Sequence, residues 1–173
     1  MTPMDTFTTA RLTAERLRPD HLDDLIPLHL DEAVSRTLGG TRTAEQTAAY
    51  VLTNLGYWDQ NGFGLWIVRD HAGQFMGRAG IRPLDLQGVR EIEIAYTFHQ
   101  AYWGQGYASE IAEALRDIAF GPLALPDLVG IVLIDHWPSR KVLEKTGLIF
   151  ERAYQDQGHD MVLYRMRNPK AAA

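Results

Sequence analysis

The sequence predicts one domain of mixed α/β class, spanning residues 1–173, with a core from about residue 10 to residue 166. The length suits one domain, and no linker, repeat or low-complexity tract divides the chain. The hydrophobic periodicity also changes from helical to alternating and back along the chain. This order predicts a mixed, mostly antiparallel sheet of about seven strands flanked by about four helices.

The first third of the chain is expected to form one strand and two helices. Residues 10–17 mix polar and apolar positions in the manner of an edge strand. A helical pattern opens at Pro19 and ends before the glycine pair at 39–40. The window 43–59 begins with a Thr-x-x-Gln capping box and continues with apolar residues at helical spacing, so it predicts the second helix.

The rest of the chain is expected to form a meander and then alternating strands and helices. Short apolar runs at 64–69, 74–82 and 90–98 are separated by turn signals and predict three consecutive strands. Helical spacing returns at Ser109 and lasts until the Gly-Pro pair at 121–122. The remaining predicted elements are a strand at 128–134 buried on both faces, a short helix at 138–145, and a closing hairpin of 148–154 and 160–166.

Composition excludes several classes of function. Lys and Arg total 17 against 22 Asp and Glu, a net charge of −5, which makes the chain a poor ligand for nucleic acid. The absence of cysteine excludes disulfides, thiolate nucleophiles and Cys-based metal sites. The histidines show no metal-ligand spacing, so no metal is expected. Neither a signal peptide nor a membrane span is recognisable, and a cytoplasmic protein without a membrane partner is expected.

The most informative window joins the strand at 90–98 to the helix that begins at Ser109. Residues 103–109 read Trp-Gly-Gln-Gly-Tyr-Ala-Ser. Glycines before a helix let the backbone approach a ligand, and the free N–H groups at the helix start suit a phosphate. The alternative is a tight turn without a ligand. A dinucleotide fold and a P-loop are excluded, because a third glycine at the right offset and a Gly-Lys-Ser/Thr sequence are both missing.

Two blocks in the right order carry a family resemblance. Residues 93–96 read Glu-Ile-Ala-Tyr, and residues 102–110 read Tyr-Trp-Gly-Gln-Gly-Tyr-Ala-Ser-Glu. Further on, residues 136–139 read His-Trp-Pro-Ser and residues 142–148 read Val-Leu-Glu-Lys-Thr-Gly-Leu. Over about residues 10–165 the chain resembles the GCN5-related N-acetyltransferases (GNAT), in particular the branch that acetylates ribosomal-protein N-termini at alanine or serine.

The resemblance implies acetyl-CoA as cosubstrate. The turn before the helix would hold the pyrophosphate through backbone N–H groups, and the preceding strand would pair with the pantetheine arm. Trp103 stands where the family has Arg or Gln, and His136 stands where the branch usually has Asn, with different hydrogen-bonding reach. The implied cosubstrate-binding residues are Ala95, Tyr96, Thr97, Phe98, Trp103, Gly104, Gln105, Gly106, Tyr107, Ala108, Ser109, His136 and Ser139.

Two residues are candidates for catalysis. Strand alternation puts Glu91 and Glu93 on one face, where carboxylates need a wet cleft. Glu93 is the candidate base, acting through a water; the alternative is an ion pair with a neighbour such as Arg82 or Arg78. Ser139 is placed by the motif where it would protonate the leaving thiolate or bind pantetheine. The alternative is a structural role as the helix N-cap, although Pro138 before it favours the first or second helical position.

The expected reaction moves an acetyl group to a primary amine by direct attack in a ternary complex. The acceptor is expected to be a peptide N-terminal α-amine or a small-molecule amine, because an α-amine is roughly a tenth neutral at pH 7 while lysine is almost fully protonated. The alternative is a non-catalytic acyl-CoA-binding or regulatory module on the same fold. A homodimer is a weak expectation.

Overall fold

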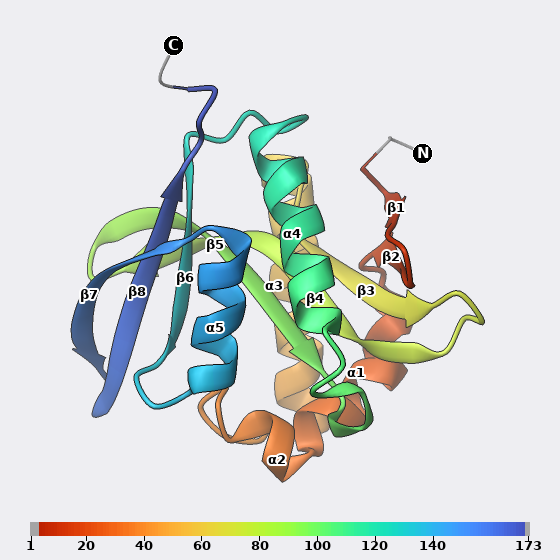
Figure 1. Ribbon diagram of the computed structural model, residues 1–173. Helices are drawn as coiled ribbons and strands as arrows, with labels where there is room; N and C mark the ends of the chain where they lie inside the picture. The colour runs from red at the N-terminus through yellow and green to blue at the C-terminus, as the bar shows by residue number, and fades with distance from the viewer. Residues whose placement is uncertain (1–3, 172–173) are drawn as a thin grey trace.

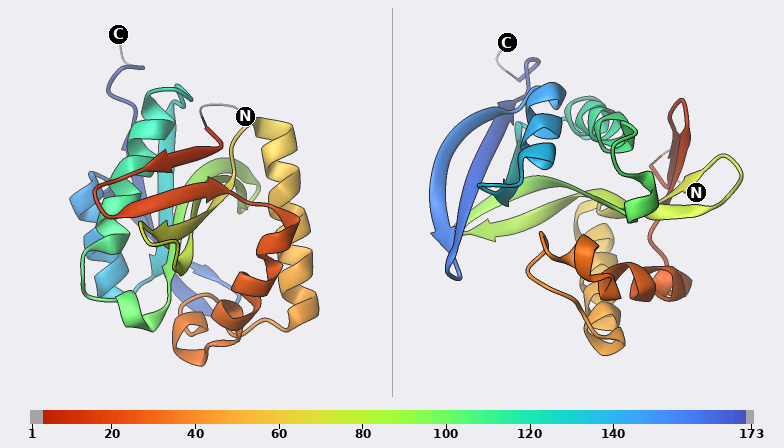
Figure 2. Two further views of the ribbon diagram at one scale, coloured as in Figure 1. Left: turned by 90° about the vertical axis from the view of Figure 1, so that its right-hand side faces the viewer. Right: turned by 60° about the horizontal axis from the view of Figure 1, so that its bottom comes forward.

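The computed structural model describes residues 4–171 and contains an eight-stranded sheet with a layer of helices on each face (Figure 1, Figure 2). The strands lie in the order β1-β2-β3-β4-β5-β6-β8-β7, and only β5 and β6 run parallel to each other. The strands are β1 (Thr6–Thr8), β2 (Leu12–Arg16), β3 (Leu65–Asp70), β4 (Phe75–Leu86), β5 (Val89–Phe98), β6 (Asp127–Leu133), β7 (Ile149–Asp156) and β8 (His159–Arg167).

Five α-helices and two 3-10 turns complete the described chain. The helices are α1 (Leu22–Leu30), α2 (Glu32–Ser35), α3 (Ala44–Asn61), α4 (Tyr107–Phe120) and α5 (Trp137–Thr146). The mixed, mostly antiparallel α/β architecture is therefore confirmed. The extra strand β1 and the extra helix α2 are too short for periodicity to mark them. The predicted boundaries at residues 1 and 173 lie outside the described residues.

Helices α1, α2 and α3 cover one face of the sheet (Figure 2). The capping box of α3 is present as predicted: the Gln46 N–H donates to Thr43 Oγ1 at 3.1 Å, and the Thr43 N–H donates to Gln46 Oε1 at 2.9 Å. Gly62, with φ of 73°, ends the helix in the left-handed conformation. The buried residues of this layer are Leu17, Leu25, Leu28, Val34, Val51, Leu65, Ile67 and Phe75.

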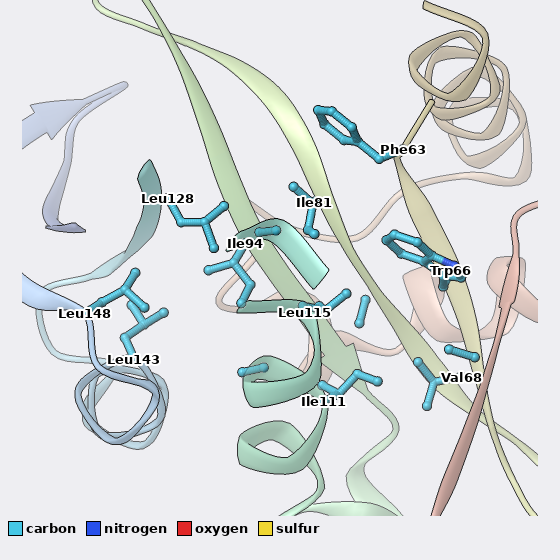
Figure 3. Close-up of a cluster of buried hydrophobic side chains, with 14 of the residues drawn as sticks. Phe63, Trp66, Val68, Ile81, Ile94, Ile111, Leu115, Leu128, Leu143 and Leu148 are labelled. Atoms are coloured by element: carbon cyan, nitrogen blue, oxygen red, sulfur yellow. The ribbon is translucent and has the colours of Figure 1, made fainter. Parts of the chain in front are cut away.

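Helices α4 and α5 cover the opposite face and bury the larger core. Figure 3 shows Ile111 and Leu115 of α4 in one cluster with Ile94 and Leu128 of the sheet, and Leu143 of α5 beside Leu148. Helix α4 begins at Tyr107, two residues before the predicted start, since Gly106 turns the chain in the left-handed region immediately before it.

The prediction that strand 128–134 is buried on both faces is correct only for its first half. Leu128, Val129 and Gly130 are buried, whereas residues 131–133 are half-buried and Ile134 lies beyond the strand with 40% of its surface exposed. The reason is that β5 pairs with β6 only at Val129 and then leaves it, so the later residues of β6 lack a neighbour on that side.

Gly80 is expected to be indispensable for the close approach of β3 and β4. A Cβ added there would lie 2.5 Å from the Gly64 carbonyl oxygen and 2.9 Å from Leu65 Cα, both on the main chain. Gly80→Ala should therefore lower the free energy of unfolding by about 1–3 kcal/mol, measured by urea denaturation. Gly56→Ala is the matched control, because open space surrounds Gly56 in α3. It should raise stability by about 0.5–1 kcal/mol. Equal effects of the two variants would contradict the packing argument.

Candidate functional site

The sheet opens between its two parallel strands. Strands β5 and β6 are paired only at Glu93 and Val129, and Figure 1 shows β5 running diagonally away from β6 beyond this point. Residues 94–98 of β5 remain paired with β4 on their other side. One edge of this stretch of β5 is therefore without a strand partner within residues 4–171.

The main-chain groups of Tyr96 and Phe98 face this opening. The His99 N–H donates to the Met76 carbonyl of β4, and N–H and C=O groups of successive residues in a strand point to alternate sides. Tyr96 and Phe98 thus present their groups away from β4. The Trp103 indole N–H donates to the Phe98 carbonyl at 2.9 Å. Trp103 therefore contacts the edge of β5 directly and helps to fix the turn that follows.

The start of α4 lies beside the opening, and its first N–H groups have no side-chain cap in the described structure. Gly104 and Gly106 have φ of 71° and 83°, a conformation that glycine adopts without strain. Space around Gly104 is open. Unpaired N–H groups and the positive end of the helix dipole together make this turn suited to an anion such as a pyrophosphate.

Arg11, which sequence reasoning missed, holds this turn in place. Its Nε donates to Glu110 Oε2 at 2.7 Å, and its Nη1 donates to the Gln105 carbonyl at 2.9 Å. Its guanidinium also lies 4.1 Å from the centre of the Tyr107 ring. The sequence carries no local signal for this contact, because Arg11 and Glu110 are 99 positions apart.

The start of α5 lies on the same side of the sheet as α4. The Ser139 hydroxyl oxygen is 3.1 Å from the Tyr96 hydroxyl oxygen, and the Ser139 N–H donates to His136 Nδ1 at 3.2 Å. His136 is thus the N-cap and Ser139 the third helical residue, which corrects the expectation that Ser139 occupies the first or second position. Burial raises the pKa of Tyr96 to about 12, so its hydroxyl stays protonated at neutral pH.

Glu93 lies on the opposite face of β5, toward α1 and α3. Arg82 Nε donates to Glu93 Oε1 at 2.6 Å, so the ion pair considered as the alternative is present. Among residues 4–171 nothing donates to Oε2, and the side chain keeps 11% of its surface exposed. The neighbouring carboxylate, Glu91, is held by Arg165 at 2.7 Å. Of the two carboxylates, only Glu93 adjoins the point where the sheet opens.

The sequence-predicted residues therefore converge from three elements on one opening. The edge of β5 supplies residues 95–98, the turn before α4 supplies 103–109, and the start of α5 supplies His136 and Ser139. Sequence reasoning assigned Tyr96 only a main-chain role and did not foresee that its hydroxyl meets Ser139. In the described chain no group of three His, Asp or Glu side chains is arranged to hold a metal. No described helix is long and apolar enough to cross a membrane.

Comparison with known proteins agrees with this geometry. Residues 11–149 match the family model of the acetyltransferase (GNAT) domain. An FsC-acetyl coenzyme A-N(2)-transacetylase from Aspergillus fumigatus is 30% identical over 83% of this chain and 64% of its own. An acetyltransferase from Agrobacterium tumefaciens has a TM-score of 0.83 at 27% identity, with 96% of each chain covered.

A more distant structure shares the fold. RimL, a ribosomal alpha-N-protein acetyltransferase solved in complex with coenzyme A, superposes with a TM-score of 0.78 at 17% identity, covering 94% of this chain and 97% of its own. The open parallel strand pair, the uncapped glycine turn before α4 and the family match over residues 11–149 lead to one conclusion: the chain belongs to the GNAT acetyltransferase family.

Proposed function

We propose that this protein is an N-acetyltransferase that moves the acetyl group of acetyl-CoA to a primary amine by direct attack in a ternary complex. The acceptor is a peptide N-terminal α-amine or a small-molecule amine. The observation that carries this proposal is the opening between β5 and β6, where an unpaired strand edge, an uncapped helix start and a carboxylate meet.

The described residues fit coenzyme A as a ligand. The free main-chain groups of Tyr96 and the N–H of Phe98 match the amides of a pantetheine arm, which would extend the sheet as a further strand does. The turn of residues 103–109 offers N–H groups to the pyrophosphate. His136 fixes the start of α5 and thereby the position of Ser139 beside Tyr96. RimL, which shares this fold, was solved in complex with coenzyme A, and this is consistent with the assignment.

The two faces of β5 supply the two proton transfers that the reaction needs. The amine nitrogen attacks the thioester carbon, its proton passes through a water to Glu93, and the bond from carbon to sulfur breaks. The leaving thiolate takes a proton from the Ser139 hydroxyl, and the Tyr96 hydroxyl 3.1 Å away reprotonates Ser139. Water then returns a proton to Tyr96 and accepts the proton held by Glu93, which restores the starting state. Glu93 accepts a proton on one face of β5, and the hydroxyls of Ser139 and Tyr96 donate protons on the other face. The amine and the thiolate therefore exchange protons with different groups.

An α-amine is the acceptor that this site serves most easily. The Glu93 carboxylate already accepts a hydrogen bond from Arg82, so an amine that is partly neutral in solution is the easier substrate. An α-amine with a pKa near 7.7–8.0 has about a tenth of its molecules neutral at pH 7, whereas a lysine side chain has roughly one in a few thousand. RimL, which is named as an alpha-N-protein acetyltransferase, is an example of such an enzyme on this fold.

Binding of acetyl-CoA should raise the melting temperature. At a ligand concentration of about 100 times Kd, binding adds about 2.7 kcal/mol to stability. For a chain of 173 residues this corresponds to a rise of roughly 5–11 °C. Thermal unfolding with acetyl-CoA, CoA, NAD and ATP at equal concentration tests it. A shift with the two CoA species and none with NAD is expected. No shift with either CoA species would contradict the site. A shift without turnover of any amine would favour a non-catalytic acyl-CoA-binding module.

Glu93→Gln should lower kcat/KM by about 100-fold, because it removes the proton acceptor. Glu91→Gln is the matched control: Glu91 lies two residues away on the same strand face and also loses one arginine partner, Arg165. Its side chain is also 11% exposed, and its kcat/KM should stay within about threefold of the original enzyme, since a change outside the site acts mainly on stability. Steady-state kinetics of both variants decide the matter, and equal losses would count against Glu93 as the base.

The rate should rise with pH and show no fall below about pH 10. The acceptor amine loses its proton through the neutral range, so kcat/KM increases. Burial raises the pKa of Tyr96 to about 12, and the proton donor is therefore retained throughout this range. Burial and the nearby Arg78 lower the pKa of His29 to about 3, so His29 stays neutral and does not titrate in this pH range. A descending limb between about pH 7 and pH 10 in a pH–rate profile would exclude Tyr96 as the reserve donor.

A further inference from the structure

A cavity of about 550 Å³ lies on the Glu93 face of the sheet and has no assigned role in the proton transfers above. We call it the arginine pocket and define it by residues 38–42, Tyr50, Asn54, Tyr57, Arg82 and Gln157. Arg82 belongs both to its wall and to the ion pair with Glu93. The pocket thus reaches, through one side chain, the point where β5 leaves β6.

Positive charge is concentrated around the pocket. The guanidiniums of Arg42, Arg78 and Arg82 lie 5.1, 4.8 and 5.8 Å from the centre of the Tyr50 ring. The described residues lining the pocket include no Asp or Glu. Within this cluster the carboxylate that pairs with an arginine is Glu93, on Arg82. Three cations grouped around one ring with a single anion leave a surplus positive charge, which favours an anionic ligand.

Two buried polar atoms of the pocket have no hydrogen-bond partner among residues 4–171. One is a donor, Arg42 Nη1, and the other is an acceptor, Asn54 Oδ1. A buried polar group without a partner costs free energy, so such groups mark places where a ligand or water completes the structure. A molecule with an anionic oxygen and an N–H group would satisfy both atoms.

Arg78 and Arg82 are held by side-chain partners, whereas Arg42 is held through its main chain. The Arg42 main-chain N–H donates to the His29 carbonyl at 3.1 Å. Arg78, 2% exposed, donates from Nε to His29 Nε2 at 3.0 Å. The pKa of His29 is lowered to about 3 by burial, by Arg78 and by Arg42, which agrees with a local excess of positive charge. Two of the three guanidiniums and the main chain of Arg42 are thus in place before an anion binds, which lowers the cost of ordering the site.

We propose that the acetyl acceptor is an amine that also carries a carboxylate, and that Arg42 binds this carboxylate in the arginine pocket. A carboxylate presents two coplanar oxygens, which match the planar N–H donors of a guanidinium. Asn54 Oδ1 is available to an N–H group of the same molecule. The inference rests on the proposed acetyl transfer and adds the chemical class of the acceptor.

Acceptors that differ only in the carboxylate test this proposal. In one arm, kcat/KM is compared for L-methionine and L-methioninamide; in a second arm, for tripeptide amides beginning with aspartate or asparagine. The two arms separate a free amino acid from an acidic peptide N-terminus as the source of the carboxylate. The carboxylate of methionine raises the pKa of its amine, so methioninamide has the larger neutral fraction at a given pH, and a preference for the acid has to come from binding. The acid should be preferred by about tenfold or more, equivalent to 1.4 kcal/mol, in at least one arm.

Arg42→Gln should reduce this acid-to-amide ratio by about tenfold, the loss of one charge-assisted contact. Arg36→Gln is the matched control, because Arg36 is exposed, precedes the same loop and lies outside the pocket. Its ratio should stay within about twofold of the original. Arg42→Lys keeps the charge without the planar fork and should give an intermediate ratio. The thermal shift with acetyl-CoA establishes that each variant is folded.

The inference is overturned if amides and acids give equal kcat/KM in both arms, or if Arg42→Gln leaves the acid-to-amide ratio unchanged. Neither result would affect the proposed acetyl transfer. If acetyl-CoA binds and no amine is acetylated, the proposed function fails instead. Calorimetric titration with the same acids and amides then tests separately whether the arginine pocket binds a carboxylate. Binding of the acid that is lost in Arg42→Gln supports the anion site, and binding of neither compound excludes it.

Discussion

The divergence of β5 from β6 is the constraint on which the rest of the structure depends. Two parallel strands that stayed paired would satisfy their main-chain groups and leave no space between them. Here the pairing ends after Glu93 and Val129, and the N–H and C=O groups of β5 beyond it need other partners. Trp103 supplies one of them. Helices α4 and α5 pack on one face and begin beside this opening, which brings the uncapped turn and Ser139 to the free strand edge.

One face of β5 carries neutral polar groups, and the other carries charged groups. On the α4 and α5 face, Tyr96 meets Ser139, and both groups are neutral hydroxyls. On the α1 and α3 face, Arg82 and Glu93 occupy paired positions of β4 and β5, and Arg78 lies opposite Thr97. Buried arginines carry a large desolvation cost, which His29, Glu93 and the Tyr50 ring offset only in part. Burying these arginines on an interior sheet face lowers the stability of the protein. A binding role explains their presence better than a structural role.

Local patterns were sufficient to predict most of the fold, because each predicted element has its signal within a few residues. The Thr43 capping box and the glycine turn at 104–106 are examples. Long-range pairing of side chains has no such signal. Nothing in the sequence around Tyr96 indicates that its hydroxyl meets Ser139, and nothing around Arg78 identifies His29 as its partner. The sequence also left open whether Glu93 pairs with Arg82 or Arg78, since both lie on the same strand face; the register, which pairs Arg82 with Glu93, resolves it.

The attachment of the glycine turn by Arg11 has a consequence for the order in which the protein matures on the ribosome. Arg11 is synthesised 99 residues before Glu110, its ion-pair partner. At about 5–20 residues per second, that interval lasts roughly 5–20 s. During about the first half of this interval β3 has not yet been made, and throughout it the hairpin of β1 and β2 has no complete α4 to hold. The glycine turn before α4 therefore reaches its final shape only after more than half of the chain has been made, and the nascent chain cannot bind a ligand there earlier.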